Sequence, residues 1–176
     1  MRTCEPHHVS ASQLLAGLAA GTLGGLAGAW VMGRFQSITR RAEQRLAEEH
    51  VEAGASERAS AAELPASPVA HAERGRELTI EEKRKAGTAV HYGFGTAVGA
   101  LYGALSEVVP GLTAWVGLPF GAGLWLTADE VLAPPRGLGP PPAGVPAREH
   151  GTAFSAHLAY GLTAETVRRA LRGVPR

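Results

Sequence analysis

The chain has 176 residues, a formal net charge of +1 and a mean hydropathy of −0.01, values that are typical of a small soluble protein. These averages hide an uneven distribution, because the stretch from Arg34 to Lys85 holds ten basic and ten acidic residues and the remainder is far more apolar. The near-equal numbers of acidic and basic residues argue against nucleic-acid binding. The single cysteine, Cys4, excludes an internal disulfide and a cysteine-based metal knuckle.

A polar N-terminal tail, 1–11, precedes a segment without charged residues from Ser12 to Gly33. Its 22 residues would span about 33 Å as an α-helix, which is enough to cross a hydrocarbon layer roughly 30 Å thick. The segment is also too long for the apolar core of a signal peptide. We therefore predict a first transmembrane helix over 12–34.

The next region, 35–78, is predicted to be an amphipathic extension of that helix followed by a flexible linker. Phe35, Ile38, Ala42 and Leu46 keep helical spacing, and charged residues occupy the other faces. From residue 53 to residue 77 the composition is rich in Ala, Ser, Glu and Pro, so this part cannot bury enough apolar surface to fold.

A helical bundle is predicted over 79–172, with spans at about 88–106, 112–128 and 151–171 and a short tail at 173–176. Thr79 and Glu82 have the spacing of a capping box, and Glu81 with Lys85 forms a favourable i,i+4 pair. The short turn at 108–111 predicts that the third span returns beside the second, with Pro119 as a kink. The proline-rich stretch 134–146 predicts an extended connector.

These elements together predict an all-α membrane protein: a bundle of three to four transmembrane helices, with a charged, partly disordered loop between the first and second. The last span is the most interrupted by polar side chains, so it either crosses fully or lies partly in the interface. Small residues spaced four apart allow helices to approach closely in lipid. The glycines predicted to serve this packing are Gly17, Gly21, Gly25, Gly95, Gly99, Gly103, Gly117 and Gly121.

The distribution of lysine and arginine predicts that the loop 35–87 faces the cytoplasm. The C-terminal arginines conflict with a simple four-span topology, because Arg168, Arg169, Arg172 and Arg176 would then lie on the outer side. Either the last helix does not cross the membrane, or the charge rule is overridden here.

An antiparallel bundle would bring several ionisable side chains to one membrane level, predicted to be cytoplasmic and near Arg34. These residues are His91, Asp129, Glu130, His150 and His157. Three interpretations stay open: the side chains only hold helix register, they relay protons or bind an ion, or they bind a metal. Their spacing matches no defined metal motif. Glu107 and Glu165 are expected in the opposite leaflet, with Glu165 balanced by Arg168 or Arg169.

Three motifs of aromatic, glycine and acidic residues recur in the C-terminal half of the chain. They are His91-Tyr92-Gly93-Phe94-Gly95 through Leu101-Tyr102-Gly103, Phe120-Gly121 with Trp125 and Ala128-Asp129-Glu130, and His157-Leu158-Ala159-Tyr160-Gly161 with Glu165. Over about residues 86–172 this pattern resembles the YagU-type bacterial inner-membrane proteins. The resemblance implies a multi-pass protein of the bacterial inner membrane with an unassigned biochemical activity and a loose association with acid tolerance. It implies no catalytic residues.

Two functions remain, and neither is enzymatic, because the sequence lacks nucleophile, phosphate-binding, dinucleotide and metal-hydrolase motifs. In the first, which the small number of spans favours, the protein is an accessory or structural subunit that docks other membrane proteins through its glycine faces. In the second, it is an autonomous homo-oligomer that conducts or senses protons or a small solute. Apart from the lipid bilayer and such subunits, no partner or cofactor is expected.

Overall fold

In this computed structural model, every element of regular structure in the described residues, 9–53, 79–132 and 142–173, is helical. The expected N-terminal tail up to residue 8, the linker over 54–78, the connector over 133–141 and the tail from residue 174 lie outside the described residues. The long helices are α1 (Ala11–Ala53), α2 (Ile80–Val108) and α4 (Ala147–Arg172). A 3₁₀ segment (Pro110–Gly117), the short helix α3 (Leu118–Trp125) and a π-helical turn (Leu126–Leu132) follow α2, and a 3₁₀ turn (Pro142–Gly144) precedes α4.

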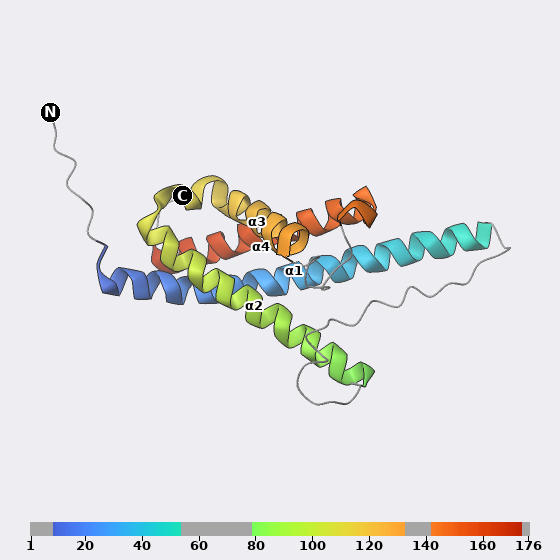
Figure 1. The fold of residues 1–176 in the computed structure, drawn as a ribbon, viewed down its shortest axis with the longest axis horizontal. Coiled ribbons are helices and arrows are strands. Elements are labelled where there is room, and N and C mark those ends of the chain that lie inside the picture. Colours follow the sequence, from blue (N-terminus) through green and yellow to red (C-terminus); the bar gives the residue numbers. More distant parts are fainter. Residues whose placement is uncertain (1–8, 54–78, 133–141, 174–176) are drawn as a thin grey trace.

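Helix α1 joins the predicted first span and its amphipathic extension into one helix of 43 residues, about 65 Å long. A capping box begins it: the Ser10 hydroxyl accepts from the backbone N–H of Gln13, and the Gln13 side chain accepts from the backbone N–H of Ser10. The second half of α1 projects beyond the other helices (Figure 1).

Helix α2 begins as the sequence predicts. The Thr79 hydroxyl accepts a hydrogen bond from the backbone N–H of Glu82, and the Glu82 side chain accepts one from the backbone N–H of Thr79. Lys85 lies 3.4 Å from Glu81, so the predicted pair is also confirmed. The stronger hydrogen bonds from Arg84 lower the pKa of the Glu81 carboxyl.

The third predicted span is not one kinked helix. Residues 115–117, at the end of the 3₁₀ segment, adopt left-handed backbone conformations, with φ of 51° at Trp115, 54° at Val116 and 80° at Gly117, and they break the helix before α3. Pro119 therefore lies in the first turn of α3, where its missing N–H costs no helical hydrogen bond, and not at an internal kink. The prediction of a continuous, Pro119-kinked helix over 112–128 is wrong.

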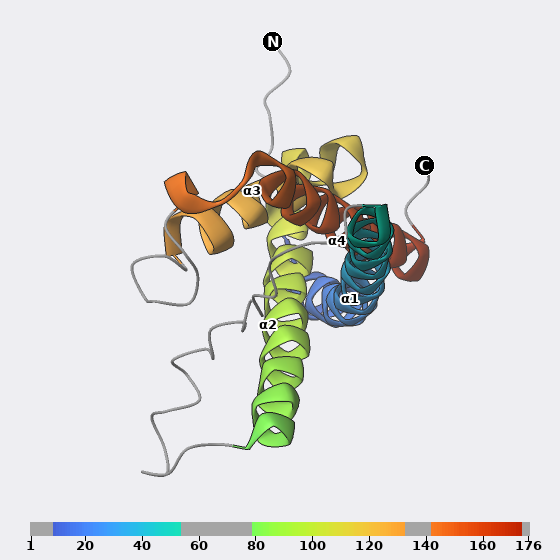
Figure 2. The ribbon, with the colours of Figure 1, turned by 90° about the vertical axis from the view of Figure 1, so that its right-hand side faces the viewer.

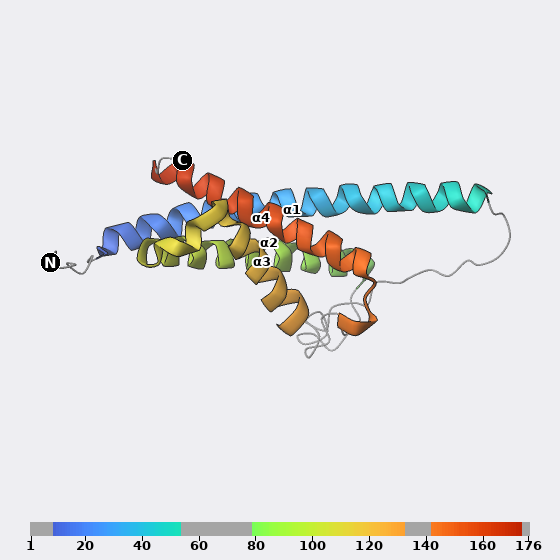
Figure 3. The same cartoon turned by 90° about the horizontal axis from the view of Figure 1, so that it is seen from above.

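Helices α2 and α4 both run antiparallel to α1 and pack along it (Figure 1). Helix α3 packs mainly against α4 and slants away from the other helices (Figure 3), although Phe120 stacks on Tyr102 of α2 at a ring distance of 4.0 Å. The expected hairpin, in which the third segment returns along α2, is therefore wrong. Figure 2 shows α1 nearly end-on, with α2 beside it.

Glycines determine how closely the helices approach. A Cβ atom on Gly21 would lie 2.7 Å from the Cα of Gly103, and one on Gly25 would lie 2.8 Å from the Cα of Gly99. On another side of α1, a Cβ on Gly24 would lie 2.5 Å from the carbonyl oxygen of Ala164 in α4. Larger side chains do not fit at these positions, so α1 contacts both partners nearly backbone to backbone.

One cluster of buried apolar side chains consists of Ala29, Met32, Ala156 and Tyr160, with partly buried aromatic and aliphatic side chains around it. Many large apolar side chains lie on the surface instead. On α1 and α2 the exposed ones include Leu15, Leu18, Leu23, Leu26, Trp30, Val90, Phe94, Leu101 and Leu105. A surface of this kind is typical of a protein that contacts lipid or other proteins.

By length and composition, one helix among the described residues, Ala11–Leu46, qualifies as a candidate membrane span. Signal sequences and core helices of soluble proteins have the same length and composition, so this feature is weak evidence of membrane association. The bundle of three to four spans stays a prediction.

Candidate functional site

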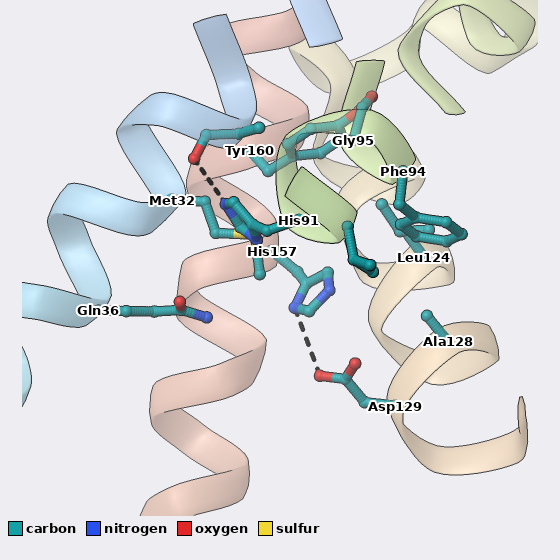
Figure 4. Close-up of a pocket in the computed structure, with 12 residues that line it drawn as sticks. Met32, Gln36, His91, Phe94, Gly95, Leu124, Ala128, Asp129, His157 and Tyr160 are labelled. Atoms are coloured by element: carbon teal, nitrogen blue, oxygen red, sulfur yellow. Dashed lines mark hydrogen bonds and ion pairs between the residues drawn. The ribbon is translucent and has the colours of Figure 1, made fainter. Parts of the chain in front are cut away.

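The structure brings three of the five predicted cluster residues to one pocket. His91 comes from α2, Asp129 from the π-helical turn after α3, and His157 from the middle of α4, and all three line a cavity of about 270 Å³ (Figure 4). The other residues that line it are Ala29, Met32, Gln36, Val90, Phe94, Gly95, Leu124, Ala128 and Tyr160. This volume is just below the roughly 300–1,000 Å³ of drug-sized ligand sites, so the pocket fits a smaller molecule.

His157 is the buried polar group of the pocket, since only 7% of its side chain is exposed. Its Nδ1 lies 3.0 Å from the carbonyl oxygen of Ala153, one turn earlier in α4. Because a carbonyl oxygen only accepts, Nδ1 carries the proton and donates. The neutral ring therefore keeps an unprotonated Nε2 that can accept a proton or a hydrogen bond.

Asp129 faces His157 across the pocket (Figure 4), with Oδ2 3.7 Å from Nδ1 of the imidazole. The Asp129 side chain is 41% exposed, so it links the buried histidine to the surface. Burial raises the pKa of Asp129, the His157 ring opposes this shift, and the neighbouring Glu130 adds to it. The carboxylate can stabilise a positive charge on the ring.

His91 connects the pocket to α1. Its Nε2 lies 2.9 Å from the carbonyl oxygen of Ala29, so this nitrogen donates and the ring, when neutral, keeps an unprotonated Nδ1. Both pocket histidines are thus oriented by backbone carbonyls. In each case the hydrogen bond to the carbonyl, and not a charged side chain of the same helix, fixes the tautomer of the neutral ring.

Tyr160 forms the inner wall of the pocket and was not predicted as a site residue. It is 1% exposed, and its hydroxyl donates a hydrogen bond of 2.6 Å to the carbonyl oxygen of Gly95 in α2. The sequence analysis named Tyr160 only as part of a motif in the last predicted span. Its role in closing the pocket depends on how α2 crosses α4, which no local pattern encodes.

The other two predicted residues form a separate pair. Nδ1 of His150 lies 2.7 Å from Oε1 of Glu130, and neither residue lines the pocket. Trp125 lies edge-on to the His150 ring at 6.2 Å. Arg34, which we expected near the cluster, lies with its guanidinium 5.8 Å from the Trp30 ring and does not line the pocket.

Within 9–53, 79–132 and 142–173, no group of three or more His, Cys, Asp or Glu residues is arranged to hold a metal ion. The residues that line the pocket include two histidines and one carboxylate, with no lysine or arginine among them. This set of groups can accept protons and hydrogen bonds, and its charge favours cations.

Glu107 and Glu165 meet at the opposite end of the bundle, in a network of five charged side chains. Glu165 is fully buried and accepts hydrogen bonds of 2.7 Å and 2.6 Å from Nε of Arg168 and Nε of Arg169. Glu107 on α2 accepts two from Arg172, at 3.0 Å and 2.9 Å, and lies 3.6 Å from Arg168. The predicted partners of Glu165 are both present.

The pairing of Glu107 with Arg172 was not predicted. The signal in the sequence was the excess of C-terminal arginines that conflicted with the charge rule for topology. Three of those arginines are paired with carboxylates from α2 and α4.

Comparison with known proteins gives one match. The model of a family described as "Protein of unknown function (DUF1440)" matches residues 74–166, which include the pocket residues His91, Asp129 and His157. Searches of the curated proteins and of the solved structures found no match.

Proposed function

We propose that this chain, which belongs to the DUF1440 family of proteins of unknown function, is a multi-pass membrane protein. In this proposal it binds a proton or a small solute in the pocket of His91, Asp129 and His157. The observation that carries the proposal is the buried His157 ring, oriented by Ala153 and facing Asp129 inside a cavity. Ionisable side chains buried within membrane helices are functional candidates by default.

The surface of α1 supports the membrane part of the proposal. In a soluble protein a long apolar helix buries its large side chains in the core, but Leu15 is 66% exposed, Leu23 is 53% exposed and Trp30 is 56% exposed. Such side chains are favourable in contact with lipid. The resemblance to YagU-type proteins adds the finer proposals of a bacterial inner membrane and a link to acid tolerance, and the distribution of lysine and arginine adds that of a cytoplasmic loop over 35–87.

The proposed chemistry is a proton taken up by Nε2 of His157. The resulting imidazolium would be stabilised by Asp129 and by the Ala153 carbonyl, while Nδ1–H keeps its hydrogen bond. His91 from α2 and Tyr160 from α4 are the other titratable groups that line the pocket, and Gln36 from α1 is neutral. Asp129 is partly exposed and would exchange protons with water.

A second candidate is the accessory subunit. Its proposed docking surfaces, the glycine faces of α1 and α2, contact each other within the chain, which argues against docking through them. The support for an accessory subunit comes from other surfaces, the exposed apolar side chains of α1 and α2, because these can contact other membrane proteins as well as lipid.

Proton flux into proteoliposomes that hold the purified protein and an internal pH dye tests the first candidate. We expect flux with the wild type and with Glu130→Gln, which changes a carboxylate outside the pocket, and a loss of at least about tenfold with Asp129→Asn and His157→Asn. Thermal unfolding of each variant checks that the fold is kept. Absence of flux in the wild type, together with stoichiometric co-purification of a larger membrane complex, would favour the accessory subunit.

A further inference from the structure

We infer that the pocket binds a small primary ammonium ion, so that the solute of the proposed function is a compact amine cation with N–H donors. The inference rests on the proposed function in that it uses the same pocket. It adds the chemical class of the ligand, which the charges and hydrogen-bonding capacities of the pocket residues determine.

The first step concerns charge. Among the twelve residues that line the pocket, Asp129 is the one acidic residue and there is no lysine or arginine. When both histidines are neutral, the lining carries a net charge of −1. An anion would meet the Asp129 carboxylate with no cationic side chain to compensate it, so a cation of charge +1 is the matched ligand.

The second step concerns hydrogen bonding. The carbonyls of Ala153 and Ala29 hold the donor nitrogens of His157 and His91, which leaves Nε2 of His157 and Nδ1 of His91 as acceptors. Tyr160 donates its hydroxyl proton to Gly95, so its oxygen can only accept from a ligand. Two ring nitrogens, one phenolic oxygen and a carboxylate can thus all accept from a donor, and a primary ammonium offers three N–H groups.

The third step concerns shape. The inner wall is closed by His157 and Tyr160, while Phe94, which is 49% exposed, and Asp129 lie towards the surface. Aromatic rings beside a cation add attraction through their π faces. Met32 and Leu124 offer apolar contact for a methyl or methylene group. The pocket therefore has an acceptor-rich polar part and an apolar part, which fits a short alkylammonium ion.

A primary ammonium can also come from the headgroup of phosphatidylethanolamine. That headgroup carries a phosphate beside its amine, and the pocket offers no basic side chain to meet it. We therefore assign the site to a free amine, and the experiment includes both sources.

The test is the binding of methylammonium to the purified protein in detergent, measured by calorimetry. We expect binding that Asp129→Asn weakens at least about tenfold and that Glu130→Gln leaves within about twofold, since the two neighbouring carboxylates differ in whether they line the pocket. Tetramethylammonium, which has the same charge and no N–H donor, is expected to bind at least about tenfold more weakly. Equal affinity for the two ions would overturn the inference.

The comparison of methylammonium with tetramethylammonium uses the wild type alone, so it does not depend on whether a variant folds. Binding of dihexanoyl phosphatidylethanolamine without any binding of methylammonium would overturn the inference, in favour of a lipid headgroup.

The outcomes separate this inference from the proposed function. Proton flux that depends on His157 and Asp129 without methylammonium binding would leave the proposed function standing and remove the inference. Methylammonium binding without proton flux would support the ligand class and limit the function to solute binding.

Discussion

The hydroxyl of Tyr102 on α2 donates a hydrogen bond of 2.9 Å to Oε2 of Glu165 on α4. Glu165 has no exposed surface, and Tyr102 is 3% exposed. The carboxylate also accepts from Arg168 and Arg169, so it has partners on its own helix and on α2. One buried carboxylate thus ties two helices together at the end of the bundle opposite the pocket.

We predict that Glu165→Gln destabilises the protein by about 3 kcal/mol, because removing one partner of a buried ion pair leaves the other charge uncompensated. Arg168 is the side chain most affected, since only 5% of it is exposed. The measurement is the free energy of unfolding in detergent. Glu149→Gln, an exposed carboxylate in the first turn of α4, is the control and should change stability by less than about 0.5 kcal/mol. Equal effects of the two substitutions would contradict the role of Glu165.

The contact between α1 and α2 yields a prediction with opposite signs for two glycines of the same helix. A Cβ on Gly99 would lie 2.6 Å from the carbonyl oxygen of Gly21, whereas a Cβ on Gly93 would meet nothing within 4 Å. We expect Gly99→Ala to destabilise the fold by about 1–3 kcal/mol through overpacking. Gly93→Ala should stabilise it by up to about 1 kcal/mol, because alanine favours the helix. Thermal unfolding of both variants tests this, and a stable Gly99→Ala protein would show that the helices can separate at little cost.

The adjacent carboxylates Asp129 and Glu130 should affect stability in opposite directions at neutral pH. Because burial raises the pKa of Asp129, the folded protein binds the carboxyl proton more tightly than the unfolded chain, in which the pKa of the aspartate is 3.8. The contribution of Asp129 to stability is therefore highest at low pH and falls as the pH rises through the raised pKa. Asp129→Asn should remove this slope and stabilise the protein slightly at neutral pH, because solvent screens the partly exposed carboxylate.

Glu130→Gln should instead destabilise the protein by about 1–2 kcal/mol, because it weakens the 2.7 Å hydrogen bond to His150. Unfolding free energies of wild type and both variants between about pH 3 and pH 7 test the pair of predictions. If the free energy of unfolding of the wild type rose relative to that of Asp129→Asn as the pH increased, the predicted direction would be wrong.

The N-terminus of α2 gives a local prediction. Thr79→Ala removes the side chain that accepts from Glu82, which should cost about 1 kcal/mol at that end of the helix. Amide hydrogen exchange in the first turn of α2 should then be about fivefold faster. Thr88→Ala is the matched control, because the Thr88 hydroxyl donates to the carbonyl of Arg84 inside the helix and alanine is the better helix former there. Unchanged exchange after Thr79→Ala would mean that the cap does not hold this turn.

Part of the candidate site could be predicted from the sequence. Antiparallel helices predicted that His91, Asp129 and His157 would lie at one level, and the structure places them around one pocket. The same argument included His150 and Glu130, which pair beside it. The position of a residue along the bundle axis follows from the helix lengths. The direction in which its side chain points depends on how each helix is rotated about its own axis, which the packing of neighbouring helices determines.

The local sequence by itself determined where the long helices form, because helical hydrogen bonds, caps and apolar spacing act within a few residues of each other. The capping box of Thr79 and Glu82 is an example, since both of its hydrogen bonds lie within four residues. Tertiary structure decided the break before α3, because Gly117 with its positive φ packs against the carbonyl of Gly161 in α4. It also decided the pairing of Glu107 with Arg172, which are 65 residues apart. Such contacts depend on the crossing of separate helices, and no local pattern in the chain specifies that crossing.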